Sequence, residues 1–123
     1  MIRPVLIAAL ALASAAPLAA RAQDAAAGET VFKRACAVCH SPQAGRNMIG
    51  PSLHGIYGRP SSQVTGFRYS EANKKANLTF DAETLERYLA DPRAVVPGTT
   101  MAYAGLKDPD QRRNLIAYLQ TLR

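Results

Sequence analysis

The chain has 123 residues, a formal net charge of +6 and 48% hydrophobic residues, with two Cys, two His and no Trp. This length and composition suit one small domain preceded by an N-terminal leader. Basic and acidic residues alternate without an aromatic-basic pattern, so the composition argues against nucleic-acid binding.

The N-terminal segment has the features of a secretory signal peptide. Arg3 supplies positive charge, residues 4–18 form an apolar run, and Ala20-Arg21-Ala22 is a small-x-small cleavage site. We expect residues 1–22 to be removed and residues 23–123 to form a periplasmic domain. Loss of the two leader arginines leaves 13 of the 15 basic residues against 9 acidic ones, a net charge of +4.

The apolar run is shorter than the about 20 residues that a membrane span requires. An uncleaved N-terminal anchor remains the alternative. Export would place the two thiols in an oxidising compartment, where a disulfide or a covalently attached haem is stable.

Both cysteines lie in Cys36-Ala37-Val38-Cys39-His40. Two thiols three positions apart occupy neighbouring positions of a helical turn, so both can form thioether bonds to the two vinyl groups on one haem edge. The histidine that follows is then placed beneath the iron. Cys-x-x-Cys-His is typical of c-type haem attachment, and histidine is a common proximal haem ligand.

The same pair of cysteines has three other interpretations. A structural zinc site needs four ligands, and Cys36, Cys39, His40 and His54 are all the Cys and His of the chain. A thioredoxin-like redox site needs a preceding strand, whereas the residues before Cys36 are alanine-rich and favour a helix. A disulfide within the motif would close too small a loop to stabilise a domain.

The hydrophobic pattern contains no strand signal and predicts an all-α fold with long loops. Together with the haem motif, it leads us to expect four to five short helices wrapped around one covalently bound haem. Gly28 inside the first predicted helix indicates a close approach of another group, since glycine costs about 1 kcal/mol there. A small domain gains stability from a bound haem, and the irregular residues 41–79 need such a group to organise them. The expected helices run from Asp24 to about Cys39, from Glu71 to Lys75, from Ala82 to Ala90 and from Pro109 onward.

The second axial ligand must come from a separate piece of chain. The candidates are Met48, Met101, His54 and the lysines. Met48 follows His40 too closely, whereas Met101 lies in a Pro- and Gly-containing loop between two predicted helices, which favours it. His/Met ligation fills both axial positions and suits outer-sphere electron transfer. The Pro51 carbonyl is the expected acceptor for the outer nitrogen of His40.

Several motifs beyond the haem motif resemble those of class I c-type cytochromes, in the mitochondrial and alphaproteobacterial branch. The resemblance covers essentially all of residues 24–123. The matching pieces are Gly28, Phe32, Cys36-Ala37-Val38-Cys39-His40, Gly50-Pro51-Ser52-Leu53-His54-Gly55-Ile56-Tyr57-Gly58-Arg59, Tyr69-Ser70-Glu71-Ala72-Asn73-Lys74, Tyr88-Leu89, Pro97-Gly98-Thr99-Thr100-Met101 and Leu115-Ile116-Ala117-Tyr118-Leu119.

The resemblance implies a set of site residues. It implies one haem c bound through Cys36 and Cys39, and His40 and Met101 as axial ligands. It also implies that the first and last helices cross at Gly28. The Pro51 carbonyl is then the acceptor of a hydrogen bond from His40, and Arg59 and Tyr69 lie near a haem propionate. Hydrogen bonds on the methionine side of the haem involve Asn73, Tyr88 and Thr99.

Two departures from the family pattern are visible. Phe80 stands where the family has a tryptophan that donates to a propionate; it can pack on the haem edge but cannot donate. The family's ring of lysines around the exposed haem edge is thinned: Arg93 and Lys107 keep the charge, but Ala35, Ala94, Thr100 and Asp108 occupy other places. Docking should therefore depend less on salt than in lysine-rich relatives.

The predicted function is a monomeric periplasmic carrier. It would transfer one electron between a quinol-oxidising complex or dehydrogenase and a terminal oxidase, reaction centre or reductase, docking transiently at the exposed haem edge. We expect no enzyme activity, small-molecule substrate or nucleic acid, and membrane contact only through partner complexes. A haem module fixed within a dehydrogenase is the second hypothesis.

Overall fold

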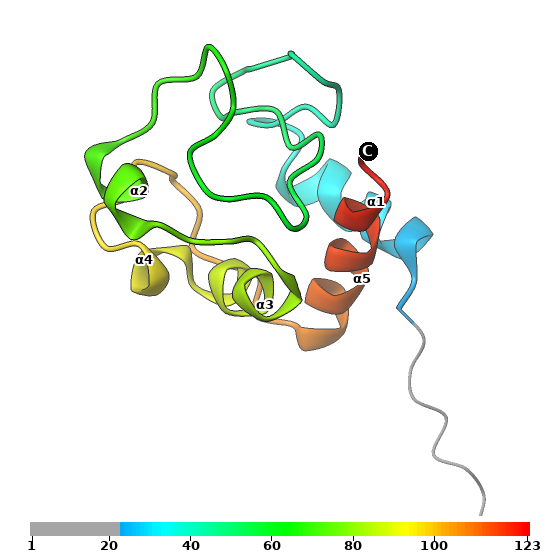
Figure 1. The fold of residues 1–123 in the computed structure, drawn as a ribbon. Helices are drawn as coiled ribbons and strands as arrows, with labels where there is room; N and C mark the ends of the chain where they lie inside the picture. The colour runs from blue at the N-terminus through cyan, green and yellow to red at the C-terminus, as the bar shows by residue number, and fades with distance from the viewer. Residues whose placement is uncertain (1–22) are drawn as a thin grey trace, which may run out of the picture.

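A computed structural model describes residues 23–123, so the predicted leader and its cleavage site lie outside the described residues. The described chain is all-α and loops connect its helices (Figure 1). The five helices are α1 (Ala25–Ala35), α2 (Glu71–Ala76), α3 (Ala82–Ala90), α4 (Pro92–Val95) and α5 (Pro109–Gln120).

Side-chain caps set the starts of the helices. The Asp24, Ser70, Asp81 and Asp108 side chains each accept a hydrogen bond from a first-turn backbone N–H at 2.8–3.1 Å. These bonds satisfy donors that have no partner inside the helix. The predicted starts are therefore confirmed. At the start of α5, the Gln111 side-chain oxygen accepts a hydrogen bond of 2.6 Å from the Arg34 guanidinium of α1. This bond joins the two helices.

The end of α1 and the presence of α4 differ from the sequence prediction. Helix α1 ends at Ala35, not near Cys39, because the N–H groups of Cys36 and Ala37 both bond to the Phe32 carbonyl and the chain then forms a separate turn. Helix α4 is not among the helices expected from the sequence, because its four residues are too few to show a hydrophobic period. Asp91 in fact ends α3 and caps α4, with Pro92 in the first turn.

Helices α1 and α5 cross closely at Gly28, with the C-terminus of the chain near α1 (Figure 1). Gly28 is buried, and a Cβ at this position would overlap the Asn114 carbonyl and approach Tyr118. Beside it, the rings of Phe32 and Tyr118 pack with centroids 5.2 Å apart. The expected close approach at Gly28 is confirmed.

The core extends from this crossing to α3 and the loops. It contains Phe32, Leu115, Ile116 and Leu119 from the crossing and Leu85 and Leu89 from α3. Residues 58–61 pair with residues 78–80 through three backbone hydrogen bonds of 2.7–3.0 Å, which fix the long loop against the segment that leads into α3.

We predict that Gly28→Ala lowers the free energy of unfolding by about 2 kcal/mol, because overpacking at a close contact outweighs the gain in helix propensity. Urea unfolding of the haem-loaded protein measures this. Ala26, exposed on the same helix, provides the control: Ala26→Gly should cost only the propensity difference of about 1 kcal/mol. Stabilisation by Gly28→Ala would contradict the close crossing.

Candidate haem site

The turn that follows α1 carries both cysteines and His40. Its N–H groups at Cys39 and His40 bond to the Cys36 carbonyl at 3.0 and 2.9 Å. Both thiols are free and half-buried. Gly50 N–H donates to the Cys39 carbonyl at 2.8 Å, so the loop after the motif folds back on it.

The surroundings of the motif do not support the zinc and dithiol alternatives. Burial, with a smaller contribution from Cys39, raises the pKa of the Cys36 thiol to about 11. A redox-active dithiol needs the opposite shift, because the thiolate is the reactive species. In residues 23–123 no group of three or more His, Cys, Asp or Glu side chains could hold a metal ion.

His40 is oriented by the loop at Gly50 and Pro51. Its Nδ1 lies 2.7 Å from the Pro51 carbonyl oxygen, and because a carbonyl only accepts, Nδ1 carries the proton. Nε2 is then free to bind a metal. Gly50 is needed here, since a Cβ at that position would overlap the imidazole ring. Burial lowers the pKa of His40, and the bond to Pro51 partly offsets this shift.

The Met101 sulfur has a hydrogen-bond donor aimed at it. The Tyr88 hydroxyl, presented by α3, lies 3.8 Å from Sδ. The Met101 backbone N–H donates to the Thr99 hydroxyl at 3.2 Å. Met48 differs, because it lies 41% exposed in the loop that orients His40. The structure therefore surrounds Met101, not Met48, with groups that orient a ligand.

Asn73 connects α2 to the loop that carries Met101. Its Oδ1 accepts from the Ser70 hydroxyl at 2.9 Å and from the Thr99 hydroxyl at 3.0 Å. Burial raises the pKa of Tyr88, and a hydrogen bond from the Asn73 side chain opposes that shift. Tyr88 thus stays a neutral donor toward Met101. The three residues grouped by the family resemblance, Asn73, Tyr88 and Thr99, do lie together.

Phe80 lies on the same side of the site as Tyr88. It is buried, and its ring meets that of Tyr88 with centroids 5.3 Å apart and planes inclined by 62°. The backbone pairing with residues 58–61 holds it in place. An apolar ring here can border a flat apolar cofactor.

Arg59 provides a test of whether a haem fits this site. Its Nη1 donates to the His54 carbonyl at 2.8 Å, but its buried Nε has no partner among the described residues. Burial lowers the pKa of Arg59, and nearby Tyr69 opposes that shift. Residues 41–70 contain no Asp or Glu. The buried Nε of this cation lacks an acceptor within residues 23–123, and a haem propionate would supply one, so the residues fit the group.

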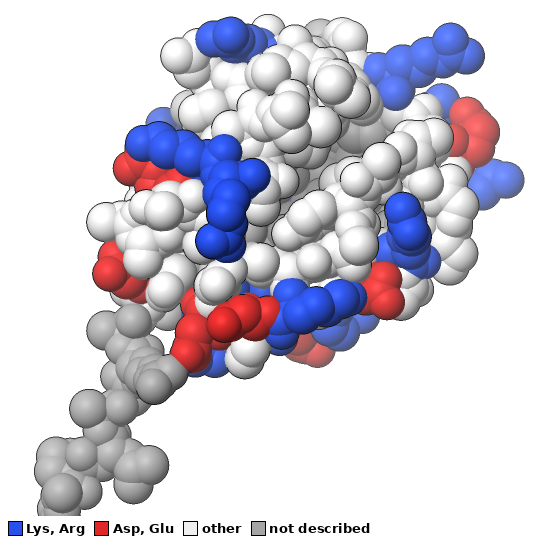
Figure 2. Space-filling view, turned by 180° about the vertical axis from the view of Figure 1, so that it is seen from behind, with Lys and Arg blue, Asp and Glu red and all other residues white. Residues whose placement is uncertain are grey.

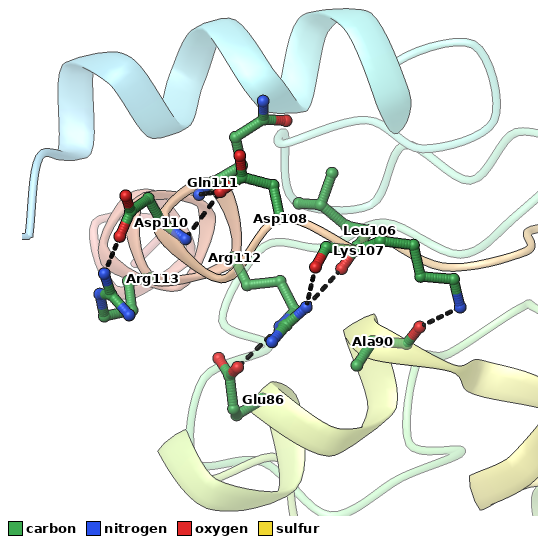
Figure 3. Close-up of polar contacts among 9 residues, drawn as sticks. All are labelled: Glu86, Ala90, Leu106, Lys107, Asp108, Asp110, Gln111, Arg112 and Arg113. Carbon is green, nitrogen blue, oxygen red and sulfur yellow. Dashed lines mark hydrogen bonds and ion pairs between the residues drawn. The ribbon is translucent and has the colours of Figure 1, made fainter.

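The segment after Met101 is fastened between α3 and α5, a feature that sequence reasoning missed (Figure 3). Leu106 N–H bonds to the Leu89 carbonyl, and the Lys107 ammonium caps α3 by donating to the Ala90 carbonyl, both at 2.7 Å. Arg112 of α5 donates to the carbonyls of Leu106 and Lys107 at 2.8 and 3.0 Å, and its Nε pairs with Glu86 at 2.7 Å.

Arg112→Ala should therefore lower the free energy of unfolding by about 2 kcal/mol, because it removes charge-assisted hydrogen bonds to two carbonyls from a side chain that is only 13% exposed. Glu86→Gln should cost less than about 1 kcal/mol, since Glu86 is 39% exposed and water screens the pair. Urea unfolding of the haem-loaded protein is the measurement.

Arg113→Ala is the matched control for Arg112→Ala. Arg113 is the next residue of α5 and pairs with Asp110 at the surface. Its loss should change stability by no more than about 0.5 kcal/mol. Equal effects of Arg112→Ala and Arg113→Ala would contradict the fastening role of Arg112.

Comparisons with known proteins place this site in context. Residues 25–123 match the Cytochrome c family. The chain is 49% identical over 100 residues to cytochrome c2 iso-2 of Magnetospirillum molischianum, covering 81% of this chain and 99% of that protein. It is 50% identical over 109 residues to cytochrome c2 of Blastochloris viridis, covering 88% of this chain and 84% of that one. The structure of cytochrome cH from Methylobacterium extorquens matches with a TM-score of 0.74 at 42% identity, covering 80% of this chain and 98% of that chain.

Proposed function

Because this chain belongs to the cytochrome c family, we propose that it is a periplasmic carrier with a His/Met-ligated haem, working between a quinol-oxidising complex or dehydrogenase and a terminal oxidase, reaction centre or reductase. The observation that carries the ligation is the placement of both candidate ligands. His40 is oriented by Pro51, and the Met101 sulfur faces the Tyr88 hydroxyl.

Family membership also decides several sequence predictions. The resemblance to class I cytochromes c and the all-α cytochrome c fold are confirmed. The cofactor is one haem c, attached covalently through Cys36 and Cys39. The protein is an electron carrier, not an enzyme, and its partners are redox proteins.

The protein's own groups hold and tune the redox centre that we propose. The haem supplies a one-electron Fe(III)/Fe(II) couple when bound. His40 Nε2 and Met101 Sδ would ligate the iron, so no coordination position would remain for a substrate. The Pro51 carbonyl strengthens the histidine as a donor, whereas the Tyr88 hydroxyl draws electron density from the sulfur. Arg59 would neutralise a propionate, and the Tyr69 hydroxyl would donate a hydrogen bond to it.

We predict that Met101→Ala abolishes the charge-transfer band of the sulfur–iron bond and lowers the midpoint potential, since methionine ligation raises it. Tyr88→Phe is the matched variant: it should keep the band and shift the potential less, because it removes only the hydroxyl aimed at the sulfur. Visible spectra and redox titration of the haem-loaded proteins give both readouts. An unchanged band in Met101→Ala would exclude Met101 as the ligand.

The location of the carrier follows from the N-terminal residues, which the structure does not describe. A signal peptide over residues 1–22, with residues 23–123 as the exported domain, would bring the protein to the periplasm. Within residues 23–123 no helix is long and apolar enough to cross a bilayer. N-terminal sequencing of the protein isolated from the periplasm tests the cleavage.

Exposed apolar side chains lie beside the haem-attachment turn. Val38, within the motif, is 73% exposed, and Ile49 in the loop that folds back on it is 77% exposed. Met48 N–H bonds to the Gly50 carbonyl and Gly50 N–H to the Cys39 carbonyl, so the loop that carries Ile49 folds back against the turn that carries Val38. Figure 2 shows basic and acidic side chains interspersed on the face that it presents. We propose that partners dock transiently at this apolar edge with modest electrostatic steering.

Electron exchange with a purified cytochrome c oxidase should then slow markedly in Ile49→Ser, because the substitution removes an apolar side chain that the partner would bury in the complex. The rate should fall only gently as salt is added. Stopped-flow kinetics across a salt series measures both. Lys74→Gln on α2, at the opposite side of the molecule from α1 in Figure 1, is the control and should leave the rate unchanged. A steep fall with salt, or a normal rate for Ile49→Ser, would contradict the apolar docking edge.

A further inference from the structure

We propose that the Ser62 hydroxyl donates a hydrogen bond to a haem propionate and so takes the place of the donor that Phe80 cannot provide. This inference rests on the proposed placement of a propionate beside Arg59 and Tyr69.

Two buried side-chain polar atoms in residues 23–123 have no hydrogen-bond partner, and both lie in one short stretch of chain. They are the Arg59 Nε and the Ser62 Oγ. A buried donor without a partner loses its hydrogen bonds to water and gains nothing in return, so such atoms are rare and need an explanation. Two of them three residues apart indicate a shared acceptor that the protein itself does not supply.

The backbone holds Ser62 in an uncommon conformation. Its φ is +60°, and Asn77 is the only other non-glycine residue of the described chain with a positive φ. The preceding residue is fixed on both sides, because Ser61 N–H donates to the Leu78 carbonyl at 2.7 Å and Leu78 N–H to the Ser61 hydroxyl at 3.0 Å. Ser62 therefore keeps a left-handed backbone conformation, which residues with a Cβ rarely adopt, at a position that its neighbours hold rigidly.

The same backbone pairing aligns Ser62 with Arg59 and Phe80. Phe80 N–H donates to the Arg59 carbonyl at 3.0 Å, and the Pro60–Thr79 bridge follows it. Ser62 lies one residue beyond the last pair, at Ser61 and Leu78. The hydroxyl, the guanidinium and the aromatic ring thus belong to one rigid unit along the proposed haem edge.

The acceptor must be a group that several donors can share. Tyr69 accepts from Val64 N–H at 3.0 Å, so its own proton is free to be donated. Arg59 Nε, Tyr69 and Ser62 then present three donors from a segment, residues 41–70, that contains no carboxylate. A carboxylate has about four acceptor sites and can take all three donors. The haem brings that carboxylate as a propionate.

The test compares holoproteins carrying Ser62→Ala and Ser62→Gly with the wild type. The haem is labelled with ¹³C at its propionate carboxyl groups, and redox-induced infrared difference spectra are recorded with the midpoint potential. Loss of the hydroxyl should shift the labelled carboxylate band. It should also lower the potential, because a less neutralised propionate stabilises the ferric state. Ser62→Gly also relieves the backbone at φ +60°, so the same shift in both variants assigns it to the hydroxyl.

Ser61→Ala is the control for a general disturbance of the loop. It removes the neighbouring hydroxyl, which holds Leu78, so it should lower stability and leave the labelled band in place. A labelled band and a potential that stay at the wild-type values in both Ser62 variants would overturn the proposal.

Arg59→Gln separates this inference from the placement on which it rests. If Arg59→Gln moves the labelled band and the Ser62 variants do not, the propionate lies beside Arg59 and the role of Ser62 is wrong. If none of the variants moves the band, the placement of the propionate is wrong as well. Haem absorption and circular dichroism of each variant establish that it is folded before the comparison.

Discussion

The close crossing of α1 and α5 is the constraint on which the rest of the structure depends. It is possible because Gly28 has no Cβ to meet the Asn114 carbonyl, and the Phe32–Tyr118 ring pair then packs beside it. The cysteine motif follows directly at the end of α1, while α5 carries Arg112, which holds the segment after Met101 against α3. One helix pair therefore positions both sides of the haem site.

The long loop before α2 is organised around charge as much as around apolar contact. It contains no acidic residue, yet it holds the half-buried Arg59 side chain, whose Nη1 donates to the His54 carbonyl and whose buried Nε has no partner among the described residues. An anion beside Arg59 would supply the missing acceptor. The haem of a cytochrome c brings apolar surface and carboxylate groups together, so in the proposed placement one molecule would both extend the core and supply the anion beside Arg59.

Local patterns predicted much of this architecture. Asp24, Ser70, Asp81 and Asp108 marked helix starts because capping depends on only three or four consecutive residues. The end of α1 was predicted wrongly, and α4 was not located, although the expected total of four to five helices is confirmed. Both depend on a choice between competing carbonyl partners, which residue types do not specify. At Asp91, the backbone N–H bonds to the Arg87 carbonyl at the end of α3, while the side chain accepts from Ala94 N–H at the start of α4.

From its sequence alone, the chain is predicted to be an all-α haem protein: the Cys36 to His40 spacing indicates the attachment chemistry, Gly28 indicates a close contact, and the family resemblance names the last helix as its partner. Only the tertiary structure decided that Gly50 makes room for the His40 ring, that Arg112 fastens the segment after Met101, and that Ser62 Oγ and Arg59 Nε are buried without a partner among the described residues. The physical reason is that motif chemistry is local, whereas burial and hydrogen-bond satisfaction depend on segments that meet only after folding.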